Sequence, residues 1–278
     1  MRKSKIFAIL LSGVLLLPAC SSDFLDRMPS NSVVADKSIE NLNDVKVALN
    51  GMYREMTNIN YYGRRMTLYA DMKGGDMLIP MIGRGDDALY TFNHSSTTGS
   101  YSGMYTQIYV VLAQVNNILS NIEAGNVELS SAADKVALED AKGQALAIRA
   151  LCHFDLARLY GYPYQKDQGA SLGFAIVTKP LTYSDKLSRN TVSQMYIQII
   201  EDLDNAMKGT DGNGGLSKDK NNGYVNYYAA ESILARVYLY KGDYDKAFAL
   251  ADDVIRNGGY TLYSNSGWVA SWGTQYGS

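Results

Sequence analysis

Residues that carry covalent or metal chemistry are scarce in this sequence of 278 residues. It contains two cysteines, Cys20 and Cys152, and two histidines, His94 and His153. Two cysteines cannot form a disulfide framework, and the histidines lack the spacing of zinc ligands. The HExxH, Cys-x-x-Cys and Walker A motifs are absent. We therefore expect neither an enzyme nor a protein that holds a metal or another cofactor.

Net charge and tryptophan are also low. The formal charge is -2, which excludes the strongly basic surface typical of nucleic-acid binding. Only 2 tryptophans and 6 phenylalanines accompany 22 tyrosines, while hydrophobic residues make up 46% of the chain, a composition typical of a globular protein. A tyrosine buries its ring and keeps a polar hydroxyl, so this excess fits either a helical core or a surface that stacks on ligands.

The first residues have the features of an export signal. Three cations precede the apolar run Ile6–Leu17, which is too short to span a membrane. Residues 17–20 read Leu-Pro-Ala-Cys and resemble the lipobox of bacterial lipoproteins. We predict that residues 1–19 are a signal peptide, that Cys20 is lipidated and that residues 20–37 are a polar tether. The acyl chains would anchor the protein to a membrane that it does not cross.

Hydrophobic residues recur every three or four positions through most of the remaining chain, which predicts helices. The longest such stretch predicts a helix that begins after Ser130 and Ser131 and ends at Gly161 and Pro163. One face of this helix is rich in alanine and is expected to be buried. Thr191 and Gln194 form a predicted capping box. The other expected helices cover about residues 38–56, with Ser38 as cap, and about 104–122, 226–241 and 243–257.

Four stretches lack a helical period. Thr57–Gly103 is the longest, and Tyr164–Arg189 contains a short extended piece from Gly173 to Pro180. Gly209–Gly223 is rich in glycine and polar residues, as in a solvent loop with one packing residue, Leu216. The last stretch, Gly258–Ser278, holds aromatic residues among glycine and serine without a helical pattern.

The order of residues within 143–163, GQALAIRALCHFDLARLYGYP, resembles the central helix of the SusD/RagB family. The lipobox and the helix after Thr191 agree with that resemblance. The residues that carry it in the central helix are Gly143, Ala145, Arg149, Ala150, Phe154, Leu156, Arg158, Leu159, Tyr160, Gly161 and Pro163. Toward the end, the spacing of a tetratricopeptide hairpin is matched by Ala235, Tyr238, Gly242, Tyr244, Ala247, Ala251 and Val254.

The resemblance implies an all-α fold of tetratricopeptide-like helical hairpins with long irregular loops. It assigns residues 38–278 to a SusD-like helical domain. Members of the family usually continue past this point, so we expect the chain to be truncated, with the C-terminal part of the fold missing.

The resemblance also implies a function. SusD/RagB proteins are lipid-anchored in the outer membrane of Bacteroidetes and exposed on the cell surface, where they bind glycans and pass them to a TonB-dependent SusC-like transporter. Two alternatives remain: a tetratricopeptide-like scaffold that binds a protein, and a peptide-binding lipoprotein of the RagB type.

The stretch Thr57–Gly103 holds the residue types that a glycan site needs. Flat aromatic rings stack on the apolar faces of sugars, and arginine, aspartate or asparagine bind the hydroxyls. The resemblance likewise places part of the site in the loops before the second helix, and Tyr101 is the first choice as a stacking residue. For each residue the alternative is a solvated loop charge or a tyrosine on the helical core. The candidates are Tyr61, Tyr62, Arg64, Arg65, Asp76, Arg84, Asp86, Asp87, Tyr90 and Tyr101.

Structural roles are expected for the polar and reactive residues of the helices. Cys152 is expected to be a small buried apolar residue, and His153 is expected to make an ordinary side-chain hydrogen bond. Asn116 is expected to be buried and to satisfy a neighbouring loop. Asp86 and Asp87 do not resemble a glycosidase pair, because adjacent loop carboxylates rarely converge on one bond.

Overall fold

The computed structural model describes residues 39–78, 87–93, 101–209, 215–220 and 223–272. The predicted signal peptide (1–19), Cys20, the tether (20–37) and the predicted cap Ser38 lie outside the described residues. So do the candidate site residues Arg84 and Asp86.

The described part of the chain is helical, which confirms the expected all-α fold. Its extended pairings are two isolated bridges, Asn41 with Glu128 and Leu172 with Thr191. The helices are α2 (Leu42–Met56), α3 (Arg65–Gly74), α4 (Asp87–Tyr90), α5 (Ser102–Glu123), α6 (Ala132–Tyr160), the 3₁₀ helix η3 (Tyr164–Lys166), α7 (Val192–Lys208), α8 (Tyr227–Lys241), α9 (Tyr244–Asn257) and α10 (Asn265–Ser271).

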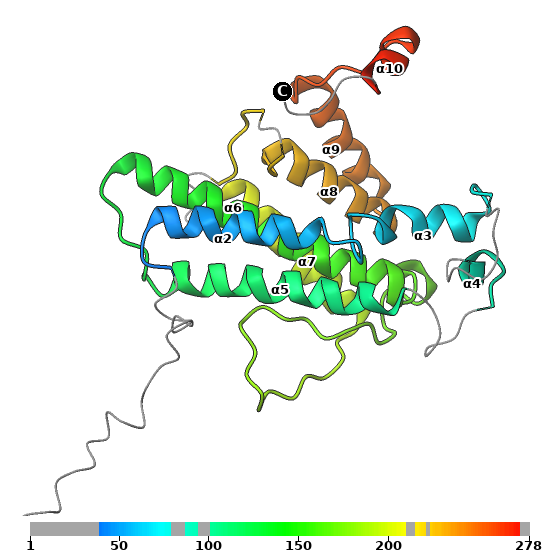
Figure 1. Cartoon of the computed structure of the whole chain (residues 1–278), viewed down its shortest axis with the longest axis horizontal. Helices are drawn as coiled ribbons and strands as arrows, with labels where there is room; N and C mark the ends of the chain where they lie inside the picture. The colour runs from blue at the N-terminus through cyan, green and yellow to red at the C-terminus, as the bar shows by residue number, and fades with distance from the viewer. Residues whose placement is uncertain (1–38, 79–86, 94–100, 210–214, 221–222, 273–278) are drawn as a thin grey trace, which may run out of the picture. The chain divides into compact units, whose positions relative to one another are not determined.

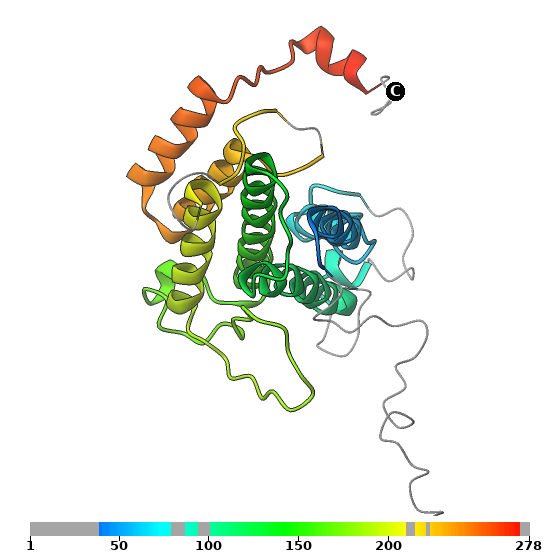
Figure 2. The ribbon, with the colours of Figure 1, turned by 90° about the vertical axis from the view of Figure 1, so that its left-hand side faces the viewer.

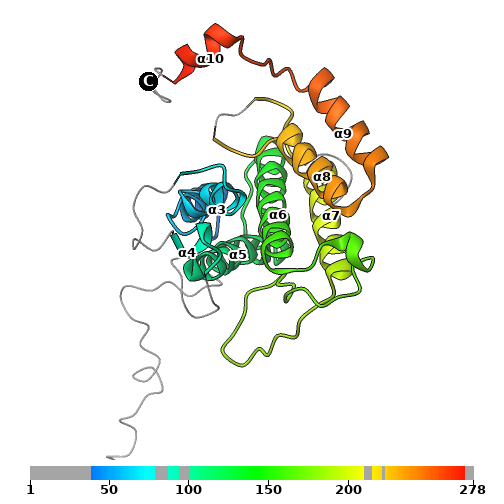
Figure 3. The same cartoon turned by 90° about the vertical axis from the view of Figure 1, so that its right-hand side faces the viewer.

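Helix α6 is the centre of the bundle. It packs against α5 and α7 most extensively and also contacts α2 and α8, and Figures 2 and 3 show it between α5 and α7. Helices α2 and α5 run side by side, as do α7 with α8 and α8 with α9 (Figure 1). Neighbouring helices therefore pack in an order that follows the chain.

The burial of α6 differs from the sequence prediction. We expected one buried face, yet every residue from Gly143 to Ala157 is buried. Gly143 and the alanines let other helices approach from several directions. A Cβ on Gly143 would lie 2.8 Å from the Ala206 carbonyl oxygen of α7, so glycine is needed at this crossing. The sequence pattern identified the helix, but the number of neighbours decided how much of it is covered.

Local capping explains where several helices begin. The capping box of Thr191 and Gln194 at the start of α7 is confirmed, with both reciprocal hydrogen bonds present. At α2 the prediction was wrong, because Asn41 rather than Ser38 is the N-cap, and Asp44 completes a second capping box. The later helices α6, α8 and α9 begin after the side-chain caps Ser131, Asn226 and Asp243.

Two stretches predicted to be irregular contain α-helices. Thr57–Gly103 includes α3 and α4, and Gly258–Ser278 includes α10. Helix α3 is capped by Gly75, whose φ of 81° is the left-handed conformation that glycine adopts freely. These helices are short and bury little, so an amphipathic period is hard to see in their sequences.

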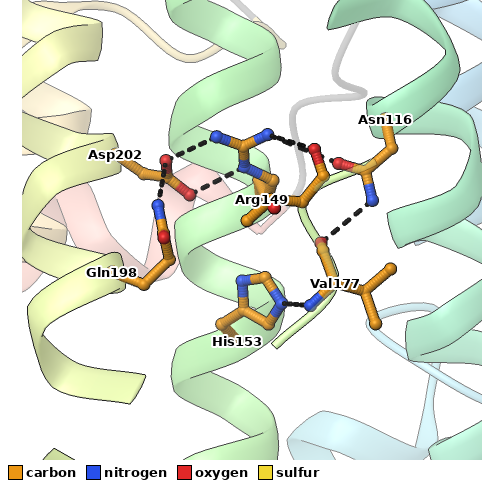
Figure 4. Close-up of polar contacts among 7 residues, drawn as sticks. Asn116, Arg149, His153, Val177, Gln198 and Asp202 are labelled. Carbon is orange, nitrogen blue, oxygen red and sulfur yellow. Dashed lines mark hydrogen bonds and ion pairs between the residues drawn. The ribbon is translucent and has the colours of Figure 1, made fainter. Parts of the chain in front are cut away.

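A buried ion pair joins α6 to α7. Arg149 donates to both carboxylate oxygens of Asp202, at 2.8 and 2.7 Å, and Gln198 donates to one of them (Figure 4). The other end of the guanidinium donates to the Thr178 carbonyl at 3.2 Å and contacts Asn116 of α5 at 3.4 Å. One arginine thus connects α5, α6, α7 and the segment after α6.

His153 and Asn116 hold the same segment, as predicted. The Val177 N–H donates to His153 Nε2 at 3.2 Å, and Asn116 donates to the Val177 carbonyl at 2.9 Å (Figure 4). Burial, and next the Arg149 charge, lower the pKa of His153 to about 3, so the ring is neutral and Nε2 accepts. Hydrogen bonds from buried side chains therefore fix the path of the segment that follows Tyr164.

Helix α9 lies at the other extreme of burial. It packs chiefly on α8, and Phe248 and Ile255 are 73% and 75% exposed. The turn between the two helices is Gly242, with φ of 89°. None of the helices in the described ranges is both long and apolar enough to cross a membrane.

Candidate functional site

The turn before α3 places the predicted Tyr61 in the interior and leaves Tyr62 partly buried beside it. Both hydroxyls donate to one carboxylate oxygen of Asp155 on α6, at 2.7 and 2.9 Å, and Arg158 binds the other oxygen. Tyr61 is fully buried, and burial followed by the Asp155 charge raises its pKa well above the usual value. The two residues therefore attach the turn to α6, and Tyr61 presents no surface to a ligand.

Tyr101 also packs inside the protein. It is 8% exposed, its hydroxyl lies 3.2 Å from the Met72 sulfur, and the Arg65 guanidinium lies 5.5 Å from its ring centroid. The ring of Tyr69 contacts it at a centroid distance of 5.8 Å. These contacts join the start of α5 to α3, so the structure gives Tyr101 a packing role in place of the stacking role that we predicted.

Other predicted residues remain at the surface. Arg64, Asp76 and Tyr90 are exposed, while Arg65 and Asp87 are partly covered. Asp87 begins α4, and Tyr90 ends it. The structure therefore brings part of the predicted set to the surface of α3 and α4, and it separates that part from the buried tyrosines.

Three residues that we did not predict form the most distinctive feature of this surface. The ammonium of Lys73 lies 5.4 Å from the ring centroid of Tyr69 and 5.6 Å from that of Phe92. It also donates to the Tyr69 hydroxyl at 3.4 Å. We call Tyr69, Lys73 and Phe92 the Lys73 cluster. A cation between two rings holds them in place through cation–π attraction.

Phe92 is exposed and has an unusual backbone. Its side chain is 65% exposed and its φ is 56°, a conformation that is uncommon for a bulky residue. The turn is held by hydrogen bonds from Phe92 N to the Leu89 carbonyl and from Asn93 N to the Ala88 carbonyl. Strained, exposed aromatic residues are more typical of binding sites than of plain surface.

The Lys73 cluster could have been predicted from the sequence only if helix α3 had been predicted first. Tyr69 and Lys73 are four residues apart and share a face of a helix, but in an irregular loop that spacing carries no meaning. Phe92 reaches them because α3 and α4 pack together. Nothing in the sequence indicated the short helix α3, so the cluster was not predicted.

The chemistry of this surface suits a ligand with both apolar and hydroxyl-bearing faces. Exposed rings can stack on C–H groups, and the ammonium offers three donors to hydroxyl oxygens. The described residues contain no group of three or more histidine, cysteine, aspartate or glutamate side chains arranged to hold a metal.

One stretch of sequence matches a catalytic motif without having its geometry. Residues 169–173 read Gly-Ala-Ser-Leu-Gly, which fits the GxSxG pattern of hydrolase nucleophiles. That pattern needs a strand-to-helix turn and a histidine base, but here the serine lies in a loop after η3. The Ser171 hydroxyl donates to Asp167, and the described histidine, His153, is buried and bound to Val177. The described geometry is not that of a nucleophile elbow.

Comparison with known proteins identifies the family. Residues 23–239 match the SusD-like family described as "Starch-binding associating with outer membrane". The chain belongs to the SusD-like family. It is similar to SusD-like protein P2 of Formosa agariphila, with 28% identity over 266 residues, covering 92% of this chain and 47% of the relative.

Solved structures show the same fold. A SusD superfamily protein from Bacteroides vulgatus has a TM-score of 0.75 and 38% identity, covering 84% of this SusD-like chain and 52% of that one. A structure described as a laminarin-binding SusD-like protein has a TM-score of 0.64 and 21% identity, covering 81% and 47%. This SusD-like chain therefore spans about half the length of the relatives that it matches.

Proposed function

We propose that this SusD-like protein binds glycans at the cell surface without chemically changing them, and that the Lys73 cluster is part of the binding site. The observation that carries the proposal is the exposed Phe92 ring, held beside Lys73 and Tyr69 by a left-handed turn. The family description and the laminarin-binding relative support a carbohydrate ligand. Arg64, Asp76, Asp87 and Tyr90 are the predicted residues best placed to add polar and stacking contacts.

Affinity electrophoresis tests this proposal. The 278-residue chain is run in native gels that contain starch, laminarin or no polysaccharide. We expect retardation in at least one polysaccharide gel, and we expect Phe92→Ala and Lys73→Met to weaken it by removing the ring and the donor. Phe248→Ala is the matched control, because Phe248 is similarly exposed but lies on α9.

Two results would count against this assignment. If the unchanged chain migrates alike in all gels, glycan binding fails and the scaffold or peptide-binding alternative gains. If the chain is retarded but Phe92→Ala and Lys73→Met behave like Phe248→Ala, the glycan site lies elsewhere.

We further propose that the protein is anchored to the outer membrane through Cys20 and delivers its ligand to a SusC-like TonB-dependent transporter. The lipobox-like residues 17–20 and the family description support the membrane association. Co-purification of a large outer-membrane porin with the tagged chain tests the transporter, and its absence would remove that part of the proposal.

Replacement of the proposed lipidation site tests the anchor. Cys20→Ala should move the protein from the membrane pellet to the soluble fraction, because no acyl chain would be attached. Cys152→Ala is the control: Cys152 is buried, so this change should leave fractionation unaltered. A Cys20→Ala protein that still sediments with membranes without detergent would contradict lipidation.

A further inference from the structure

A concave surface lies between α5 and the segment from Phe174 to Arg189. Its volume is about 500 Å³, within the range of small-molecule sites. One wall is the α5 face that carries Tyr105 and Tyr109, and the other includes Leu187. We call this surface the α5 groove.

Aromatic rings line both walls of the α5 groove. The centroid of Tyr105 lies 4.9 Å from that of Tyr109 on the same helix and 5.4 Å from that of Phe174 across the groove. Tyr105 is 37% exposed, so its ring is accessible from solvent. The groove therefore offers flat, accessible aromatic surface from two separate parts of the chain.

A cation fixed beside these rings adds hydrogen-bonding capacity. Arg189 lies over Phe174, 5.8 Å from the ring centroid. Its Nε and Nη2 donate to the carbonyl oxygens of Gly173 and Leu172, at 2.7 and 2.8 Å. Among the described residues its Nη1 has no partner, so two donor hydrogens remain for a ligand.

The wall that carries Phe174 is held firmly. Gly173 N donates to the Asn190 carbonyl at 2.8 Å, Asn190 N donates back to the Phe174 carbonyl at 3.1 Å, and the Asn190 side chain accepts from Ile176 N. Just beyond, Val177 is bound by His153 and Asn116 in the core (Figure 4). A preformed wall lowers the entropic cost of binding.

Tyr160 connects the groove to the Lys73 cluster. Its ring contacts Tyr105 at 5.4 Å and Phe174 at 5.6 Å. Burial raises the pKa of Tyr160 to about 12, and the next contributions come from Tyr69 and Tyr105, so both of these tyrosines lie near its hydroxyl. Aromatic residues thus continue from Phe92 and Tyr69 to Tyr105 and Phe174.

We propose that the α5 groove is a second sugar-binding subsite, which holds another sugar residue of the glycan strand that contacts the Lys73 cluster. This inference rests on the proposed function. Phe174 and Tyr105 would stack on the apolar face of a pyranose ring, and Arg189 Nη1 would donate to its hydroxyls. Two subsites on one strand make affinity increase with the length of the glycan.

The test compares short and long oligosaccharides by calorimetry. Maltotriose and maltoheptaose serve as probes if starch retards the chain, and laminaritriose and laminariheptaose if laminarin does. The unchanged protein should bind the heptaose more tightly than the triose. Phe174→Ala and Tyr105→Ala should each reduce heptaose affinity by about fivefold to tenfold, the loss expected for one aromatic contact, with little effect on the triose. Phe92→Ala should weaken both.

Tyr183→Ala is the matched control, because Tyr183 lies on the same segment, is fully exposed and does not line the groove. Thermal unfolding of each variant checks that the fold is kept, and Tyr105→Ala leaves the hydrogen bonds of the opposite wall untouched. If both groove variants keep the full preference for the heptaose, the second subsite is excluded while the proposed function stands. If the unchanged chain binds neither polysaccharide, the proposed function and this subsite both fail.

Discussion

Helices α6 and α9 were both predicted from a period of apolar residues, but their surroundings are opposite. In α6 every residue from Gly143 to Ala157 is buried, including the charged Arg149 and Asp155. In α9 one residue, Ala247, is buried, and the apolar stripe that contains Phe248 and Ile255 faces solvent in the described part of the chain. Helix α6 has four helical neighbours, whereas α9 packs chiefly on α8.

This contrast shows that periodicity reports which face of a helix can be buried, not which face is buried. It also separates two kinds of polar residue. Inside α6 the buried charges of Arg149 and Asp155 have fixed partners, in the pairs Arg149–Asp202 and Arg158–Asp155. On α9 the ion pair Arg256–Asp252 is exposed. The same chemical interaction should therefore have very different energetic consequences in the two helices.

The largest difference is expected for the two arginines. Arg149→Met should lower the free energy of unfolding by about 3–5 kcal/mol, because it leaves the Asp202 carboxylate buried without its partner. Arg256→Met should leave the free energy of unfolding almost unchanged, since solvent screens that pair. Urea unfolding measures both.

A double variant shows whether the loss at Arg149 comes from the unpaired charge. Arg149→Met with Asp202→Leu should recover much of the stability, because no charge is then left in the core. Equal losses for Arg149→Met and Arg256→Met would overturn the contrast between the helices.

A smaller difference is expected for two isoleucines. Ile148→Val on α6 should cost about 0.5–1.5 kcal/mol, because it removes a methylene from a close-packed interior. Ile255→Val on α9 should have almost no effect, since Ile255 is 75% exposed and Ile148 is 1% exposed. Chemical denaturation of the two variants in parallel is sufficient. A measurable cost at Ile255 would mean that another surface covers α9 in solution.

The smallest effect concerns pH at the boundary between the two regions. Glu231 of α8 is buried near Asp253 of α9, and burial, followed by the Asp253 charge, raises its pKa from 4.5 to about 7, with Lys218 opposing. Above pH 7 the folded protein carries the cost of a buried carboxylate. As the pH falls from 7 to 4.5 the folded state takes up a proton before the unfolded state does, so this group adds stability.

Glu231→Gln should remove that gain. His153 acts in the opposite direction, because its lowered pKa makes folding less favourable as the pH falls below 6.5. The His153 contribution is the same in both proteins, so it cancels when the unfolding free energy of Glu231→Gln is subtracted from that of the unchanged protein. This difference should move in favour of the unchanged protein as the pH falls from 7 to 4.5. A pH-independent difference would show that Glu231 titrates normally.

Most of the fold could be predicted from the sequence, and the candidate site could not. The long helices and the Thr191–Gln194 capping box depend on residues three or four positions apart, which the sequence displays directly. Tyr61 and Tyr101 were chosen for a glycan site because they are tyrosines in an apparent loop. The burial of Tyr61 depends on Asp155, 94 residues later, and that of Tyr101 on contacts with Met72 and Tyr69 of α3.

The Lys73 cluster was missed for the same reason. Phe92 lies in a region without a visible period, and nothing nearby in sequence indicates that its ring meets Lys73. The α5 groove is further removed, since its walls come from α5 and from a segment some 70 residues later. Long-range packing determined both surfaces.

By itself, the sequence determined the helical class, the positions of the long helices, several of their caps and the likeness to SusD-like proteins. The tertiary structure alone decided which tyrosines are buried and which rings face solvent. It also decided that residues 143–157 of α6 are covered on all sides, whereas most of α9 is not. The physical reason is the separation along the chain of the residues that interact. Backbone hydrogen bonds, caps and periodicity are set within one or two helical turns, whereas burial is set by whichever distant segments pack against a residue.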